Sequence, residues 1–209
     1  MLENIKIVKP NEIEQNSMAI ITKELGDRTF PPLEAPIVKR CIHTSADFDY
    51  ADNLCFSKGA VEQAIEAIKN GASIVTDTNM AAAGINKKKL AEFGGSVHCF
   101  MADEDVALEA KEKGCTRAVV CMERGAKIEG PVIFAIGNAP TALIHLYELI
   151  REKKADPVLV IGVPVGFVNV VESKELYLGT EIPHIIAKGR KGGSNIAAAI
   201  CNALIYQTK

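Results

Sequence analysis

The sequence of 209 residues lacks the features that would direct it to a membrane or to nucleic acid. It has no run of about eighteen uncharged apolar residues, the length that crosses a bilayer. Its N-terminus, MLENIKIVKPNEIEQ, carries charges where a signal peptide needs an apolar centre. A net charge of −2 argues against a nucleic-acid partner or a polybasic membrane-surface protein. We therefore expect a soluble cytoplasmic protein with no nucleic-acid or membrane partner.

Clustered cysteines are also missing. No C-x-x-C pair occurs, and the six cysteines are dispersed at Cys41, Cys55, Cys99, Cys115, Cys121 and Cys201. A protein zinc site needs clustered ligands, and a disulfide framework suits small secreted domains better. Cys99 and Cys121 fall in apolar, strand-like runs where buried free thiols are ordinary. We predict structural or incidental roles for these thiols and no protein-bound metal.

The common nucleotide-binding patterns are absent as well. The segment GRKGGS (189–194) departs from G-x-x-x-x-G-K-[ST]. No G-x-G-x-x-G follows a strand-like run with an acidic residue about twenty positions later. A nucleotide site therefore has no specific signature here, although an anion site of another kind stays open.

The composition and the alternation of strand-like with helix-like segments are typical of an α/β protein. Apolar residues make up 48% and charged residues 24%, and the length suits one sizeable core, so we expect a single domain over 1–209. Short β-branched runs alternate with amphipathic stretches, which predicts a doubly wound domain: a mostly parallel sheet covered by helices on both faces. Strands are predicted at 73–77, 96–101, 117–123, 130–138, 157–163 and 184–189. Helices are predicted at 10–26, 57–71, 86–95, 103–114, 139–154 and 192–207, with a turn or short helix at 173–178.

Four segments meet the description of ligand-binding loops beyond the ends of parallel strands: 76–84, 136–142, 162–174 and 188–199. In the last, Gly192 and Gly193 would let the backbone approach a ligand, next to a helix N-terminus and the charges of Arg190 and Lys191. The GNAPTA segment would aim a second helix N-terminus at the same rim. These features predict an anionic ligand large enough for several loops, although glycines that merely shape tight turns are the alternative.

Four segments resemble, in order, the motifs of the precorrin-8X methylmutase family. They are IHTSADF (42–48), AIGNAPTAL (135–143), PVGFV followed by ESK (164–174), and GR followed by GGS (189–194). The resemblance spans roughly residues 10–200, and the second and third segments are its specific parts.

The resemblance implies an isomerase that moves a methyl group from C11 to C12 of a corrinoid ring, in precorrin-8X or cobalt-precorrin-8, without an organic cofactor. It also implies a homodimer with active sites near the subunit interface; hand-off of the product to the next enzyme would fit. The family's histidine, the proton donor or acceptor, falls on His43. Substrate contacts carry over to Ser17, Arg40, Arg117 and the loop containing Arg190, Gly193 and Ser194.

The residues around His43 fit such a role. The preceding segment RTFPPLEAP (28–36) opposes regular structure and fixes the entry of residues 39–49, so Arg40 and His43 can face one cavity. Thr44, Ser45 and Asp47 are then candidates to orient the imidazole. A surface or core histidine satisfied by Ser45 or Asp47 is the alternative. Structural roles are expected for His98 and His145, and His184 carries no clear signal.

Two other classes of function stay open. A nucleotide- or coenzyme A-binding α/β protein would use the GRKGGS loop for phosphate and leave corrin absorbance unchanged. A non-catalytic corrinoid carrier would bind the ring with or without His43 and turn over no precorrin.

Overall fold

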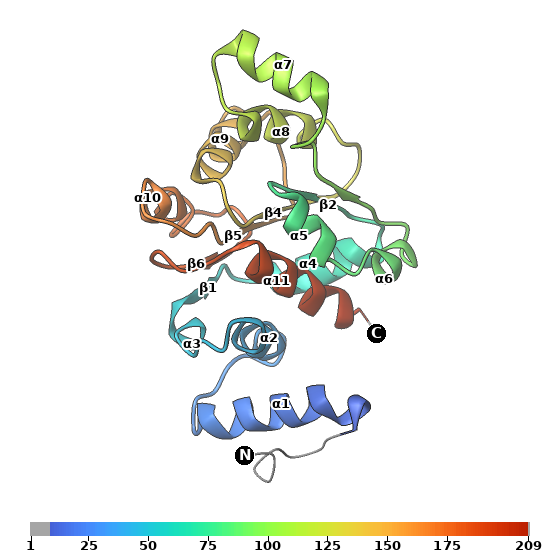
Figure 1. Ribbon diagram of the computed structural model, residues 1–209, viewed down its shortest axis with the longest axis vertical. Helices are drawn as coiled ribbons and strands as arrows, with labels where there is room; N and C mark the ends of the chain where they lie inside the picture. Colours follow the sequence, from blue (N-terminus) through green and yellow to red (C-terminus); the bar gives the residue numbers. More distant parts are fainter. Residues whose placement is uncertain (1–8, 209) are drawn as a thin grey trace, which may run out of the picture.

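Six strands form one sheet in the order β1-β6-β5-β4-β2-β3 (Figure 1). The computed structural model describes residues 9–208. The strands are β1 (Leu54–Phe56), β2 (Ser73–Thr76), β3 (Val97–His98), β4 (Val132–Ile136), β5 (Leu159–Gly162) and β6 (His184–Ala187). Only the pairing of β1 with β6 is antiparallel. The expected mostly parallel sheet is confirmed.

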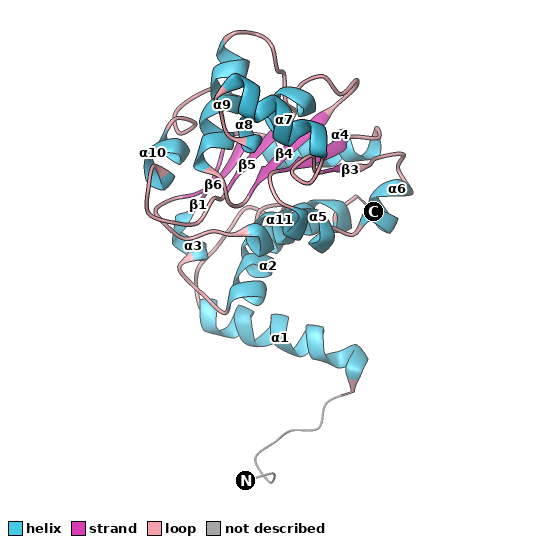
Figure 2. Cartoon of the chain, turned by 45° about the horizontal axis from the view of Figure 1, so that its top comes forward, coloured by secondary structure: helices cyan, strands magenta, loops and turns pink. Residues whose placement is uncertain are grey.

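Helices cover both faces of this sheet, as a doubly wound fold requires (Figures 1 and 2). One face carries α2 (Ala35–Ser45), α4 (Ala60–Lys69), α5 (Asn79–Gly84), α6 (Lys87–Ala91) and α11 (Ser194–Tyr206). The other carries α7 (Glu104–Lys113), α8 (Arg117–Gly125), α9 (Pro140–Arg151) and α10 (Val170–Glu175). The short α3 (Tyr50–Asn53) follows α2, and α1 (Pro10–Leu25) packs on the outer side of α2. Among residues 9–208, no helix has the length and apolarity to cross a membrane.

Alternation along the strands divides the core into two layers. Ile74 and Ile133 belong to the apolar cluster under α2, α4 and α11. Their chain neighbours Val75 and Phe134 belong to the cluster under α8 and α9. Successive strand side chains point to opposite faces, and both faces are covered, so these strands are apolar at nearly every position.

The prediction of a strand at 117–123 is wrong, because this segment lies within helix α8. Its buried residues include Ala118, Cys121, Met122 and Gly125, at the i, i+3, i+4 and i+7 spacing of one helix face. The β-branched pair within the segment suggested a strand, but the spacing of its apolar residues decides for a helix. Cys121 is therefore buried on a helix rather than in the sheet.

The segment 39–49, which contains His43, is helical as far as Ser45. After the proline-rich loop, α2 begins at Ala35 and contains Pro36 in its first turn, where a missing N–H costs nothing. The helix ends at Ser45, and Ala46 follows with a left-handed φ of 54°. Arg40 and His43, three residues apart, consequently lie on neighbouring positions of one helix face.

Candidate active site

His43 borders a cavity of about 230 Å³ between α2 and α11. The lining residues are Arg40, His43, Thr44, Gly84, Asn195, Ala198, Ala199 and Asn202. The imidazole is exposed, and within residues 9–208 no group forms a hydrogen bond to it. The expectation that Arg40 and His43 face one cavity is met. Both ring nitrogens of His43 are therefore available to a bound molecule.

A second hollow, of about 460 Å³, lies on the other side of His43 against α1. Ser17 lines it together with apolar side chains that include Ile20, Ile21 and Phe48. The Ser17 hydroxyl donates to the Ile13 carbonyl at 2.9 Å, so its oxygen remains an acceptor for a ligand. The structure thus brings Ser17 and His43, 26 positions apart in sequence, to one apolar hollow.

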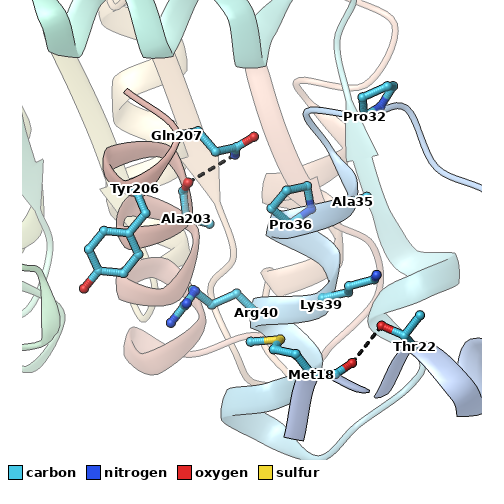
Figure 3. A pocket seen from close by; sticks show the side chains of 10 residues that line it. All are labelled: Met18, Thr22, Pro32, Ala35, Pro36, Lys39, Arg40, Ala203, Tyr206 and Gln207. Atoms are coloured by element: carbon cyan, nitrogen blue, oxygen red, sulfur yellow. Dashed lines mark hydrogen bonds between the residues drawn. The ribbon is translucent and has the colours of Figure 1, made fainter. Parts of the chain in front are cut away.

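Arg40 is held from two sides. Its Nη2 lies 2.6 Å from the Glu14 carboxylate of α1, and its guanidinium lies 5.1 Å from the centre of the Tyr206 ring of α11. Figure 3 shows Arg40 reaching from α2 toward α11, among the residues that line a groove of about 410 Å³. The arginine therefore links three helices, and its cationic head already holds a carboxylate.

The expected support of the imidazole by Ser45 and Asp47 is not found. Ser45 donates to the Cys41 carbonyl at 2.7 Å, within its own helix. Asp47 and Asp49 both lie 2.6 Å from Lys191 Nζ, and the bond to Lys191 lowers the pKa of Asp47. These carboxylates thus tie the end of α2 to the 188–193 loop instead of orienting the histidine.

The GNAPTA segment does not offer its amides to a ligand, contrary to the sequence prediction. The carboxylate of Asp77 accepts hydrogen bonds from the amides of Gly137, Asn138 and Ala139 at 2.9, 2.8 and 2.6 Å. Asp77 is 1% exposed, and burial raises its pKa while the three amides act in the opposite direction. An internal anion, supplied by the loop after β2, fills the place foreseen for a substrate carboxylate.

The close backbone approach at the GRKGGS loop is also internal. A Cβ on Gly192 would lie 2.1 Å from the Val163 carbonyl oxygen, and the amide of Gly193 donates to that same oxygen at 2.9 Å. The Gly193 amide is therefore engaged, and these glycines let two loops pack rather than admit a ligand. Ser194 lies at the start of α11 with its hydroxyl 2.8 Å from that of Thr78. All four predicted loops do meet at one edge of the sheet.

Comparison with known proteins identifies the family of this chain. A family model described as precorrin-8X methylmutase matches residues 12–207. Two relatives named cobalt-precorrin-8 methylmutase, from Priestia megaterium and Salmonella typhimurium, are each 44% identical; they cover 94% and 97% of this chain and 88% and 98% of their own lengths. The crystal structure of precorrin-8X methylmutase from Thermus thermophilus has a TM-score of 0.86 at 40% identity and covers 94% of this chain and 97% of that one. The chain belongs to the precorrin-8X methylmutase family. It is thus an isomerase that transfers a methyl group within one molecule.

Within this methylmutase, the loop after β6 carries a cation whose surroundings differ from those of Arg40. The Arg190 guanidinium lies 5.4 Å from the centre of the Phe167 ring, and no carboxylate of residues 9–208 forms an ion pair with it. Nearby, Lys174 is 1% exposed and donates to the carbonyls of Gly189 and Lys191 at 2.7 and 2.8 Å. Burial lowers the pKa of Lys174 to about 8. The sequence motif ESK by itself indicates no role for this lysine.

Arg117 lies apart from the other predicted site residues. It opens α8, on the face of the sheet opposite α2, and its Nη1 is 3.5 Å from the Met101 carbonyl oxygen. The structure does not bring this arginine to the His43 cavity. A contact with the substrate by Arg117 remains a prediction from the family resemblance.

Asn195 and Asn202 were missed, although the sequence holds a signal for them. They are spaced seven apart in an otherwise apolar helix, which puts both on one face of α11. Asn202 is engaged: it donates to the Gly84 carbonyl and accepts from the Asn86 amide, both at 2.8 Å. Asn195 is exposed in the cavity beside His43, as a further polar group toward a ligand.

Proposed function

We propose that this methylmutase converts precorrin-8X or cobalt-precorrin-8 by moving a methyl group from C11 to C12 of the ring, with His43 as the proton donor and acceptor. The observation that carries the proposal is the place of His43 in a chain of this family. Its imidazole is exposed and lies between two hollows, one shared with Arg40 and the other with Ser17.

The reaction requires a proton donor and a substrate ring that is held in a fixed orientation. Methyl migration across a conjugated ring is an isomerisation, so it consumes no electrons and needs no nucleophile from the protein. A proton placed on the ring redistributes the conjugation and lowers the barrier to a sigmatropic shift. Histidine suits this task because its ordinary pKa near neutrality lets it give and take a proton. Such a group typically contributes about 10²–10⁴ in rate, and the rest comes from orientation and electrostatic stabilisation.

The surroundings of His43 suit the two kinds of surface that the substrate presents. A corrinoid ring is flat and apolar, with acetate and propionate groups around its edge. Ile20 and Ile21 from α1 and Ala198 from α11 offer apolar contacts on the two sides of the histidine. Arg40 and Arg190 are candidates for the carboxylates at the edge.

A second copy of the chain belongs to the proposal. The hollows beside His43 are open and measure about 230 and 460 Å³, too little to enclose a whole corrinoid ring with its side chains. Large apolar side chains remain exposed close by on α1 and α5: Ile13, Ile20 and Met80 are 53%, 57% and 73% exposed. A homodimer that covers this face would complete the slot. Sedimentation analysis should give twice the mass of the chain, and a strict monomer that turns over substrate would remove this part of the proposal.

The decisive test follows the visible spectrum of precorrin-8X, and of cobalt-precorrin-8 in parallel, after addition of wild type or His43→Ala. Wild type should produce the spectrum of hydrogenobyrinate or cobyrinate, and the variant should be slower by about 10²–10⁴. His98→Ala is the matched control, because His98 bonds to Ser96 at 2.7 Å and lies outside the cavity. Equal conversion by His43→Ala would remove His43 from the chemistry.

Each rival function has its own result in this assay. Binding of the ring without turnover by wild type would indicate a carrier, and binding of adenine nucleotides with no spectral change would indicate the phosphate-binding alternative. Direct hand-off of product to the next enzyme would appear as faster product release when that enzyme is added.

A further inference from the structure

We propose that Lys174 is a positioning residue for substrate binding: its buried amino group fixes the loop on both sides of Arg190, so that the guanidinium and the Phe167 ring together receive one carboxylate edge of the ring. The inference rests on the proposed function, because it assigns a role in binding the same substrate.

Lys174 is buried in an unusual way. Its side chain is 1% exposed, yet its amino group bonds to two backbone carbonyls, of Gly189 and Lys191, and to no carboxylate of residues 9–208. Taking an amine out of water without an opposite charge is unfavourable, and an apolar side chain of similar size would fill the same space without that penalty. Filling the core therefore does not account for a lysine here, whereas holding two carbonyls does.

The two carbonyls flank Arg190, and the carbonyl of Arg190 itself also accepts a hydrogen bond. The amide of Gly166 donates to it at 3.2 Å. Three successive carbonyls, of residues 189, 190 and 191, are thus fixed by donors from Gly166 and Lys174. This arrangement determines the direction in which the Arg190 side chain leaves the loop.

The fixed loop presents a cation on an aromatic ring. The Arg190 guanidinium lies 5.4 Å from the centre of the Phe167 ring, a distance typical of a cation–π contact. Phe167 is 81% exposed and Val168 78% exposed, so this apolar tip is open to a ligand. A guanidinium beside an exposed aromatic face matches an apolar ring with a carboxylate at its edge.

Two cations of the site, Arg40 and Lys191, are already paired with carboxylates, whereas Arg190 is not paired with one in the described part of the chain. Arg40 pairs with Glu14, and Lys191 pairs with Asp47 and Asp49. Arg190 has no such partner within residues 9–208. A substrate carboxylate can bind it without first displacing a carboxylate of the protein.

The experiment is a double-mutant cycle on binding of the product, hydrogenobyrinic acid, followed by its visible absorbance. The four proteins are wild type, Lys174→Met, Arg190→Ala and the double variant. Each single substitution should raise Kd about tenfold, while Lys174→Met should add less than about twofold in the Arg190→Ala background. At saturating substrate, kcat of Lys174→Met should stay within about threefold of wild type, since the proposed role is in binding and not in proton transfer.

Independent effects of the two substitutions, or an unchanged Kd in Lys174→Met, would overturn the proposal and leave Lys174 a structural residue. Lys174→Gln is the second variant, because its amide can still donate to one carbonyl, and its Kd should fall between those of wild type and Lys174→Met. A Gln variant that binds as weakly as Arg190→Ala in a folded protein would also count against it. Turnover by wild type but not by His43→Ala, measured in parallel, keeps a failure here distinct from a failure of the proposed function.

Discussion

The two sides of the candidate site are built by different means. On one side, α2 presents His43 mainly through packing: its residues Ile37, Val38, Cys41 and Ile42 are buried, and no side chain of residues 9–208 bonds to the imidazole. On the other side, the loops after β2, β4, β5 and β6 are held by polar groups in the interior. A helix satisfies its own backbone, so apolar contacts suffice to aim its side chains. A loop leaves amides and carbonyls unpaired, and some other group has to bind them.

Two buried ionisable side chains of opposite type, Asp77 and Lys174, bind the unpaired backbone groups of these loops. Asp77 accepts from three successive amides, and Lys174 donates to the two carbonyls that flank Arg190. Each is 1% exposed and bonds to backbone rather than to an opposite charge. The conformation of the site loops therefore depends on two buried ionisable side chains, whereas the position of His43 does not.

The largest effect is expected from Asp77→Ala. Removing the carboxylate leaves the amides of Gly137, Asn138 and Ala139 without their acceptor, and each lost bond to a buried group costs about 1–3 kcal/mol. We expect the free energy of unfolding, measured with urea, to fall by about 4 kcal/mol. Asp156→Ala, at an exposed aspartate, is the control and should change it by less than about 0.5 kcal/mol. A loss below about 1 kcal/mol for Asp77→Ala would show that water replaces the carboxylate.

A smaller effect, dependent on pH, is expected from Lys174. Burial lowers its pKa to about 8 from the ordinary lysine value of 10.5. Between these values the unfolded chain holds a proton that the folded protein has released, so the stability of wild type should rise with pH relative to Lys174→Met. The difference between the two unfolding free energies should shift by roughly 2–3 kcal/mol from pH 7.5 to 10.5. A flat difference over this range would mean that the folded protein keeps the lysine protonated.

The fold could be predicted from sequence wherever the apolar pattern is long. The β-branched runs at 130–138 and 157–163 identify β4 and β5, and the amphipathic stretch at 57–71 identifies α4. The sequence pattern does not predict β1 or α2, and it misassigns the segment 117–123. β1 has three residues and owes its pairing to β6, which lies far away in sequence. At 117–123, two β-branched residues suggest a strand. The burial of one face of α8 shows that the segment is a helix.

The site could be predicted in part for the same reason. Arg40 and His43 are three apart, and the expectation that they face one cavity holds, although the helix that places them, α2, is not among the predicted elements. Sequence shows that the GNAPTA segment has free amide donors and that the motif glycines allow a close approach. It does not show which partner uses them, so both features suggest a ligand. That partner is Val163 in one case and Asp77 in the other, and only the packing of one loop on another reveals it.

The smallest effect tests whether the difference between the two arginines matters to the substrate. The Glu14 carboxylate pairs with Arg40 at 2.6 Å, but the Glu14 side chain is 60% exposed. Surface ion pairs of this kind contribute about 0.2–1 kcal/mol of interaction free energy. Glu14→Gln should therefore lower Kd for the corrinoid product about two- to fivefold, because the substrate no longer competes with a carboxylate for Arg40. Glu12→Gln, on the same helix, gives the same change in net charge and should leave Kd within about 1.5-fold at 0.15 M salt. If both variants tighten binding equally, the gain comes from the overall charge of α1. If Glu14→Gln weakens binding instead, the Glu14 contact holds Arg40 in the orientation that binds substrate, and Arg40, like Arg190, depends on a positioning partner.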